Sequence, residues 1–219
     1  MIRRISIAVG LSLVLASALP AQIIRAPNRP RQPPAWITGS IGFAQLGTVD
    51  DGATQSTWHF GDGAQYRISL EKPMQGDVAL GVAATFARAS LTYETNDITS
   101  ACPGSCDADA SIYQVLGVMH AGGSAFGFSQ IFNLAVGATI YNDFRERQSG
   151  AKIGPAGADP DVTFQFGYGF GYALSPDLQL QVVQDIGTTI HQRTGLVGGA
   201  HTASLQYTTR IGVRYALGR

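Results

Sequence analysis

The sequence predicts an all-β protein, an eight-stranded antiparallel up-and-down transmembrane β-barrel. Three observations predict it: one stretch with strict two-residue alternation, a series of similar stretches whose connections alternate between long and short, and an exported chain that is poor in charge. Each observation is weak alone, because soluble β-proteins also alternate, but together they indicate a barrel that closes on itself within a membrane.

The stretch Val162–Leu174 reads VTFQFGYGFGYAL and gives the pattern in its clearest form. Because successive strand side chains point to opposite faces, one face carries the large apolar residues and the other carries Thr163, Gln165 and a series of Gly and Ala residues. Tilted by ~45°, such a strand spans roughly 30 Å, the thickness of the hydrocarbon core of a bilayer.

Seven further stretches continue the pattern, and with Val162–Leu174 they give strands over Ala35–Leu46, Ser56–Glu71, Asp77–Tyr93, Asp109–His120, Ala125–Phe144, Leu178–Ile190 and Ala203–Leu217. Gly61–Gly63 predicts a bulge in the second strand. In the third strand Leu91 and Tyr93 change parity relative to Phe86, which predicts an irregularity near Arg88–Ser90. Asp109–His120 alternates least clearly and is assigned from its place in the series.

The connections between these strands alternate in length along the chain. The short ones are 72–76, 121–124 and 175–177, and the long ones are 47–55, 94–108, 145–160 and 191–200. Outer-membrane barrels have short periplasmic turns and long extracellular loops, and both of their termini lie in the periplasm. The alternation therefore indicates a membrane barrel more strongly than any single strand does.

The N-terminus has the three parts of a secretory signal peptide. Arg3 and Arg4 precede the apolar run Ile5–Ala16, and the small residues Ala18 and Ala21 follow. We expect a signal peptide over residues 1–21, a Pro/Arg-rich periplasmic lead-in over 22–34, and the barrel over 35–219. Cleavage after Ala18 or Ala21 fits this pattern, with Ala21 favoured. Either leaves 13 basic and 15 acidic side chains, a net charge of −2, which argues against a nucleic-acid partner.

Composition indicates which face of the strands meets lipid. A soluble barrel would place Lys and Glu on its polar face, but only 14% of residues here are charged and the polar face carries small groups suited to a narrow interior. We therefore expect the apolar face outward. Aromatic residues near the strand ends suit the two interfacial girdles: Trp36, Trp58, Tyr66, Phe144, Phe164, Tyr172, Tyr207 and Tyr215.

With these features in view, the chain resembles the small outer-membrane barrels of the OmpA/OmpX type over nearly all of its mature length. Its closing stretch Arg210–Leu217 resembles the C-terminal signal that such proteins present to the barrel-insertion machinery, although this chain ends in Leu217-Gly218-Arg219 where the family usually ends in an aromatic residue. The resemblance implies the outer membrane of a Gram-negative cell envelope, with membrane lipid and the insertion machinery as partners.

Five charged residues fall on the predicted inner face: Arg67, Asp143, Asp185, Arg210 and Arg214. Because buried charges must be paired or solvated, we expect them to form a network of Arg–carboxylate contacts in the lumen. The network could line a gate or narrow pore, or it could be a plugged polar core. An eight-stranded interior is filled by side chains, which favours the plug.

Cys102 and Cys106 lie in a predicted extracellular loop around Pro103-Gly104. A disulfide is expected there, because the chain is exported. The alternative, a pair of metal-binding thiols, lacks nearby histidines. We predict no metal and no cofactor.

Four histidines are candidate catalytic groups: His59, His120, His191 and His201. His201 and Ser204 have opposite parity, and spacing alone assembles no nucleophile, base and orienting acid, so exposed loop histidines are the simpler interpretation. We expect a structural or surface-interaction protein that is not an enzyme. A narrow pore and a lipid-modifying enzyme are the alternatives.

Overall fold

The computed structural model describes residues 33–52, 54–74, 77–98, 100–155, 160–191 and 202–218. These lie in one of two compact units, Gln32–Arg219. The predicted signal peptide and all of the predicted lead-in except Pro33 and Pro34 lie outside the described residues. No helix in the described part of the chain is long and apolar enough to cross a membrane.

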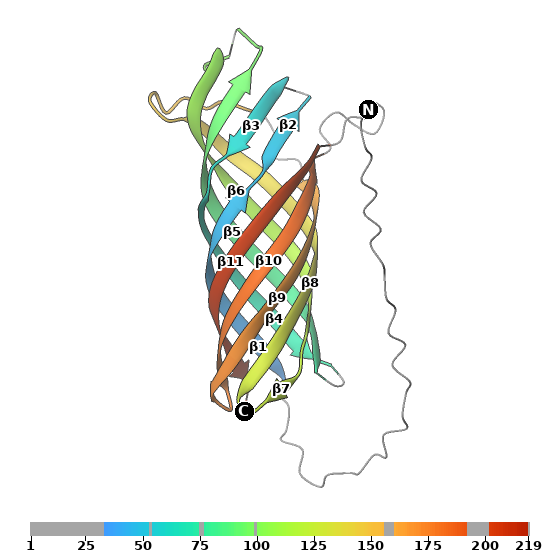
Figure 1. The fold of residues 1–219 in the computed structure, drawn as a ribbon. Helices are drawn as coiled ribbons and strands as arrows, with labels where there is room; N and C mark the ends of the chain where they lie inside the picture. Colours follow the sequence, from blue (N-terminus) through green and yellow to red (C-terminus); the bar gives the residue numbers. More distant parts are fainter. Residues whose placement is uncertain are drawn as a thin grey trace, which may run out of the picture. The chain divides into compact units, whose positions relative to one another are not determined.

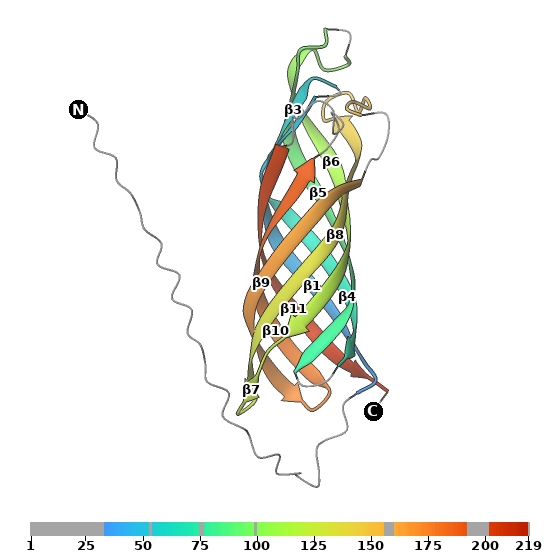
Figure 2. The same cartoon turned by 90° about the vertical axis from the view of Figure 1, so that its right-hand side faces the viewer.

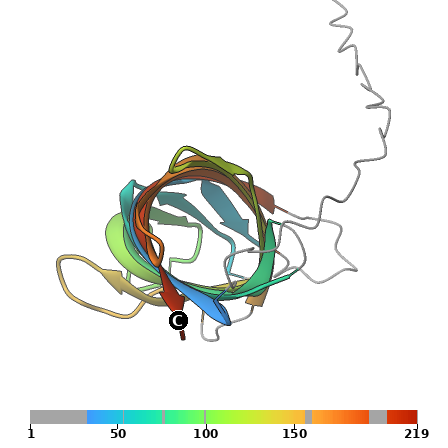
Figure 3. The ribbon, with the colours of Figure 1, turned by 90° about the horizontal axis from the view of Figure 1, so that it is seen from below.

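Eleven strands form one antiparallel sheet that closes into a barrel (Figures 1 and 3). They are β1 (Ala35–Leu46), β2 (Thr48–Asp51), β3 (Ser56–Phe60), β4 (Gly63–Pro73), β5 (Val78–Thr95), β6 (Gly104–Ala121), β7 (Ser124–Ala125), β8 (Phe128–Glu146), β9 (Pro160–Ser175), β10 (Leu178–His191) and β11 (Thr202–Leu217). The barrel wall has eight strands, because β2 continues β1, β3 continues β4, and β7 is one arm of a short hairpin with β8. The predicted fold class is confirmed.

The register around the wall sets the tilt of the strands. Starting from Phe170 on β9 and crossing one strand pair at a time, the path passes through the residues Val182, Ile211, Ile41, Tyr66, Phe86, Tyr113 and Ile140 and returns to β9 at Pro160. The path therefore shifts by ten residues (170 − 160) in one circuit. This stagger tilts the strands, as closure of an eight-stranded barrel requires.

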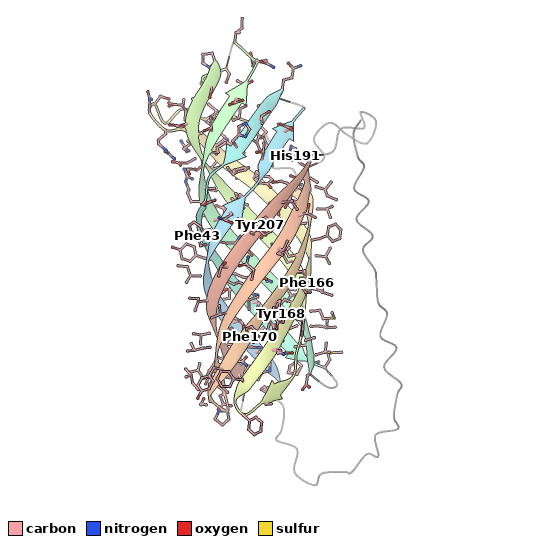
Figure 4. The ribbon with its side chains drawn as sticks, viewed as in Figure 1. Phe43, Phe166, Tyr168, Phe170, His191 and Tyr207 are labelled. Carbon is pink, nitrogen blue, oxygen red and sulfur yellow. A yellow bond between two sulfur atoms is a disulfide. The ribbon has the colours of Figure 1, made fainter. Side chains whose placement is uncertain are left out.

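A belt of exposed apolar side chains surrounds the barrel, so the predicted orientation of the two faces is confirmed. On β9, Phe166, Tyr168 and Phe170 point away from the axis, whereas Gln165 is buried (Figure 4). Such an exterior suits hydrocarbon and not water. Long strands with short turns at one end indicate that this end is periplasmic and the other extracellular.

Above the belt, at the extracellular end, the pattern reverses. The sheet continues as an extension formed by β2, β3 and the upper parts of β5, β6 and β8 (Figures 1 and 2). Its interior is an apolar core that includes Trp58, Leu91, Tyr93 and Phe144. On β5 the outward residues here are polar, such as Thr92 and Glu94. The extension is thus built like a soluble barrel.

This reversal corrects the predicted irregularity near Arg88–Ser90. Strand β5 runs without a register shift from Val78 to Thr95, and Leu91 and Tyr93 point inward into the apolar core. The change of parity in the sequence marks the point where the strand leaves the membrane, because the apolar face must then turn from lipid to the protein interior.

On other strands the apolar residues turn inward because a bulge or a break changes which alternate residues face the interior. Strand β8 has such a bulge, where the register with β6 shifts between Asp109 and Ser111 and Asp143 adopts a φ of 51°. Beyond the bulge Phe144 points inward and Arg145 outward. Breaks at Gly47 and at Gly61–Asp62 act similarly between β1 and β2 and between β3 and β4.

Three of the aromatic residues assigned to the girdles are therefore placed elsewhere. Trp58 and Phe144 lie in the core of the extension. Trp36 faces the lumen at the periplasmic end, where the guanidinium of the buried Arg214 lies 4.7 Å from the centre of its ring. The other five are outward and exposed: Tyr66, Phe164, Tyr172, Tyr207 and Tyr215.

The predicted Ala121–Ser124 turn is also corrected. The chain reverses at Phe126-Gly127, between β7 and β8, with φ values of 54° and 82°. Two left-handed residues in a two-residue loop are the geometry of a type I′ hairpin, which matches the twist of the flanking strands.

Candidate functional site

Hydrogen bonds cross the lumen between strands on opposite sides of the barrel. Arg67 on β4 donates from Nη1 to Oε1 of Gln165 on β9 at 3.0 Å, and these strands are four steps apart around the wall. A second crossing joins Gln114 on β6 to Gln206 on β11, with Nε2 and Oε1 3.3 Å apart. Because both bonds span the diameter, side chains occupy these levels of the lumen.

The third crossing lies at the periplasmic end and is charged. Arg214 donates from Nη2 to Oε2 of Glu71 at 2.9 Å and from Nη1 to Nε2 of His120 at 3.0 Å. Arginine has no acceptor, so His120 accepts through Nε2. Ser69 donates to Oε1 of Glu71 at 2.8 Å, which occupies the second carboxylate oxygen.

A second ion pair lies deeper in the barrel. Nε of Arg210 donates to Oδ2 of Asp185 at 2.5 Å, and both side chains are almost fully buried. Gly167 on the neighbouring strand makes room for this pair, since a Cβ atom at that position would collide with Oδ1 of Asp185. A buried carboxylate and guanidinium in this arrangement satisfy each other's charge.

Above the ion pairs, uncharged polar side chains fill the lumen. The hydroxyls of Thr139 on β8, Thr163 on β9 and Thr189 on β10 bond in sequence across three strands. Gln114 donates to Thr139 at 3.0 Å and accepts from Nε2 of Gln165 at 3.0 Å. This layer links the Arg67–Gln165 and Gln114–Gln206 bonds into one network.

His191 ends the polar lumen where the apolar core of the extension begins. Nδ1 of His191 lies 2.6 Å from Oδ2 of Asp161, and Nε2 lies 3.6 Å from Oδ1 of Asp51. The ring packs edge-on against Trp58 at 5.2 Å. Burial lowers the pKa of His191, but the carboxylates of Asp161 and Asp51 outweigh this and raise it to about 9. At neutral pH the ring is therefore a cation between two carboxylates, above the lipid-facing belt.

The extracellular tip combines a disulfide with a polar cleft. Cys102 and Cys106 are bonded, with their Cα atoms 5.8 Å apart. A cleft of about 700 Å³ lies beside them. Its lining comes from three connections and includes Gln55, Thr95, Asn96, Ser100 and Lys152. A volume of this size is in the range of small-ligand sites.

The structure brings four of the five predicted lumen charges into the barrel interior: Arg67, Asp185, Arg210 and Arg214. Asp143 lies elsewhere, on the outer face above the belt, where it contacts Arg88 and Arg145. The bulge at Asp143 is the cause, because one extra residue reverses the parity on which the prediction relied.

Sequence reasoning missed two partners in the lumen and misplaced two histidines. Glu71 and His120 each lie at the end of a predicted strand, where His120 is expected to be exposed, yet both are buried beside Arg214. His191 is also buried, whereas His59 is exposed as expected. Alternation did contain the signal for Glu71, since it has the parity of Arg67 and Ser69. His201 lies outside the described residues.

Comparison with solved structures identifies the fold. Neisserial surface protein A (NspA) superposes with a TM-score of 0.56 at 12% sequence identity, over 84% of this chain and 97% of that one. This chain is a small eight-stranded outer-membrane β-barrel. The outer-membrane protein OprG from Pseudomonas aeruginosa (TM-score 0.47, 15% identity, 84% and 96% covered) and the outer-membrane protease OmpT from Escherichia coli (TM-score 0.41, 8% identity, 84% and 94% covered) are more distant.

No family model matches the chain, and no curated protein matches it in sequence. The likeness to NspA is therefore one of fold, and it agrees with the lipid-facing belt in placing the protein in the outer membrane. Among the described residues, no group of three or more His, Cys, Asp or Glu side chains is arranged to hold a metal ion.

Proposed function

We propose that the protein is a non-conducting barrel that anchors a rigid extracellular extension in the outer membrane for contact with partners outside the cell. The bonds that cross the lumen support the non-conducting part. Arg67–Gln165, Gln114–Gln206 and Arg214–His120 each join strands four steps apart, so a permeating ion would have to break three crossings in succession.

The extension supports the contact part of the proposal. Its apolar core holds β2 and β3 rigidly against the upper part of β5, and its outer surface is polar. The disulfide lies beside the cleft at the tip. Loops that only reverse the chain could be short, whereas this tip is ordered, polar and contains a cleft. Such a surface, held on a rigid scaffold, suits the binding of a partner.

Planar-bilayer recording tests the non-conducting part directly. Folded native protein should give no unitary conductance. The Gln114→Ala/Gln206→Ala variant should also stay closed because two crossings remain, and Arg67→Ala/Gln114→Ala/Arg214→Ala, which removes all three, should give small, measurable openings. A reproducible conductance from the native protein would instead support the narrow pore. If charge alone blocked the lumen, Arg214→Gln would conduct and Gln114→Ala/Gln206→Ala would not.

A binding assay on whole cells tests the contact part. Cells that display the native protein should adhere to their extracellular target more than cells displaying Gln55→Ala/Asn96→Ala, which alters the cleft and leaves the extension core intact. His59→Ala on the outer surface of β3 is the matched control. Equal adhesion of all three would count against the cleft as the contact surface.

The lipid-modifying enzyme remains the third candidate. His120 and His191 are both buried among fixed partners, which does not favour access by a lipid substrate. Extracts of outer-membrane lipid from overexpressing cells should show an unchanged mass spectrum, and a new acylation state would support the enzyme.

A further inference from the structure

The outer face of the barrel carries a group of cations just above the lipid-facing belt. Four cationic side chains are exposed in the extracellular half of the barrel: Arg88, Arg145, Arg147 and Lys152. Among the described residues of that half, no other Lys or Arg is exposed. All four lie on β5, on β8 or in the connection that follows β8. The exposed positive charge of the described extracellular half is thus confined to one side.

Three neighbouring strands place this group at the edge of the belt. The last apolar outward residues are Phe86 on β5, Tyr113 on β6 and Ile140 on β8, which are register partners. The next outward residue on β5 is Arg88, which pairs with Ser111 on β6. The lipid headgroups of a bilayer begin where its hydrocarbon ends, so the arginines lie at headgroup level.

Two of the guanidinium groups share one carboxylate. Oδ2 of Asp143 accepts from Nη1 of Arg88 at 3.0 Å, and Oδ1 accepts from Nε of Arg145 at 2.7 Å. Asp109 holds Arg147 through Nη2 at 2.8 Å. None of the described residues bonds to Nη2 of Arg88 or to Nη2 of Arg145, so N–H groups of both remain available to a further acceptor.

The bulge in β8 is what creates the group. Asp143 has a left-handed φ of 51°, a strained conformation for a residue other than glycine. Without the extra residue Arg145 would point into the apolar core and Asp143 into the barrel. The bulge therefore places arginines on the outer face where regular alternation along β8 would not.

We propose that Arg88, Arg145 and Arg147 bind the phosphate of a lipid in the outer leaflet, with its acyl chains against the paired rings of Phe86 and Tyr113. Guanidinium groups match phosphate oxygens in a two-pronged geometry, and the pair of rings, 5.2 Å apart, lies directly below on the same face. The position beside the hydrocarbon is the reason a lipid phosphate, and not a free anion, is the ligand.

Native mass spectrometry of the full folded chain in neutral detergent, titrated with bis-phosphorylated lipid A, tests the site. The native protein should bind the lipid, and each arginine replaced should weaken binding by about fivefold, as expected for a cation close to a charged membrane surface. Arg88→Gln/Arg145→Gln/Arg147→Gln should thus lose most of the affinity. Lys72→Gln at the periplasmic end is the matched control and should bind as the native protein does.

Two further arms separate this site from ordinary surface ion pairs and from a free-anion site. Asp143→Asn disrupts the ion pairs but keeps the cations, so affinity should be equal or higher. Dephosphorylated lipid should bind as weakly to the native protein as lipid A binds to the triple variant, and inorganic phosphate should not displace lipid A.

The proposal is overturned by native-like lipid A affinity in the triple variant, by an equal loss in Lys72→Gln or Asp143→Asn, or by displacement with inorganic phosphate. Should the triple variant fail to fold, Arg145→Gln alone provides the same comparison, because this side chain is half exposed.

Discussion

The guanidinium of Arg210 and the carboxylate of Asp185 face each other inside the barrel, with Nε and Oδ2 2.5 Å apart and both side chains almost fully buried. The residues belong to adjacent strands, β11 and β10, and are held in place by the register of the wall. Neither charge can be removed without leaving its partner buried in a narrow polar interior.

Asp185→Ala should therefore lower the free energy of unfolding by about 3–5 kcal/mol, the usual cost of leaving one buried charge without its partner. Urea unfolding in lipid vesicles, followed by tryptophan fluorescence, measures this. The double variant Asp185→Ala/Arg210→Met should recover much of the loss. A single variant as stable as the native protein would show that Arg210 is solvated in the lumen.

A substitution at Gly167 tests the packing of the same ion pair and leaves both charges in place. Gly167→Ala places a methyl group against Asp185 and should destabilise the barrel by about 1–3 kcal/mol, as overpacking typically does. Gly117→Ala on the lipid-facing side is the control, because its nearest atom, the carbonyl oxygen of Val136, is 3.6 Å away. Equal unfolding free energies for the two variants would contradict the close approach of Gly167 to the Asp185 carboxylate.

The extension should be able to unfold while the membrane barrel stays folded. Trp58→Ala leaves a cavity among buried aromatic residues and should destabilise the extension by about 3–5 kcal/mol. Limited proteolysis should then cleave the extension, while the heat-dependent gel shift of the folded barrel is retained. His59→Ala, outward on the same strand, should leave both unchanged, and loss of the gel shift in Trp58→Ala would mean that the two parts unfold together.

The stability of the extension should depend on pH through His191. Its pKa is raised from 6.5 in the unfolded chain to about 9 by Asp161 and Asp51, so the folded form binds the proton more tightly. The stabilisation is complete below pH 6.5 and is lost as the pH rises through about 9. Protease resistance of the extension should fall over this range in the native protein. His191→Gln should give a flat profile, and a native profile that rises with pH would have the wrong sign.

The periplasmic hairpin offers a stabilising substitution. Phe126 has a φ of 54° at the first position of its two-residue turn, where asparagine is preferred and a bulky residue costs about 1 kcal/mol. Phe126→Asn should raise the free energy of unfolding by about that amount in urea titrations. Phe128→Asn, which removes a lipid-facing ring from the same hairpin, should lower it.

Alternation was sufficient to predict most of the strands, but the closed barrel also required the alternating lengths of the connections, and the outward belt required the small, uncharged residues of the polar face. Val162–Leu174 is clear because it crosses the whole bilayer without a break, and its predicted orientation is that of β9 in the structure. Arg67, Asp185, Arg210 and Arg214 were placed inward by the same rule, since no bulge separates them from the belt on their own strands.

Alternation no longer predicts the environment of a side chain where a strand leaves the membrane or carries an extra residue. Leu91 and Tyr93 keep the inward direction of β5 while the environment changes around them, and a sequence pattern cannot distinguish this from a register shift. Asp143 and Phe144 reverse because of a bulge that depends on pairing with β6. His191 falls in a predicted loop because β10 continues one residue past the predicted strand Leu178–Ile190. His120 ends a predicted strand that alternates too weakly to show which way its side chains point.

Single cysteines along β5, in a background with Cys102 and Cys106 replaced by serine, test the central claim that this strand passes straight through the membrane surface while its two faces exchange roles. A fluorophore at Val82→Cys should be quenched by a lipid-attached nitroxide, Thr92→Cys should react with a membrane-impermeant maleimide, and Leu91→Cys should do neither in the folded protein. Quenching by lipid at Leu91→Cys, or protection of Thr92→Cys, would contradict the account.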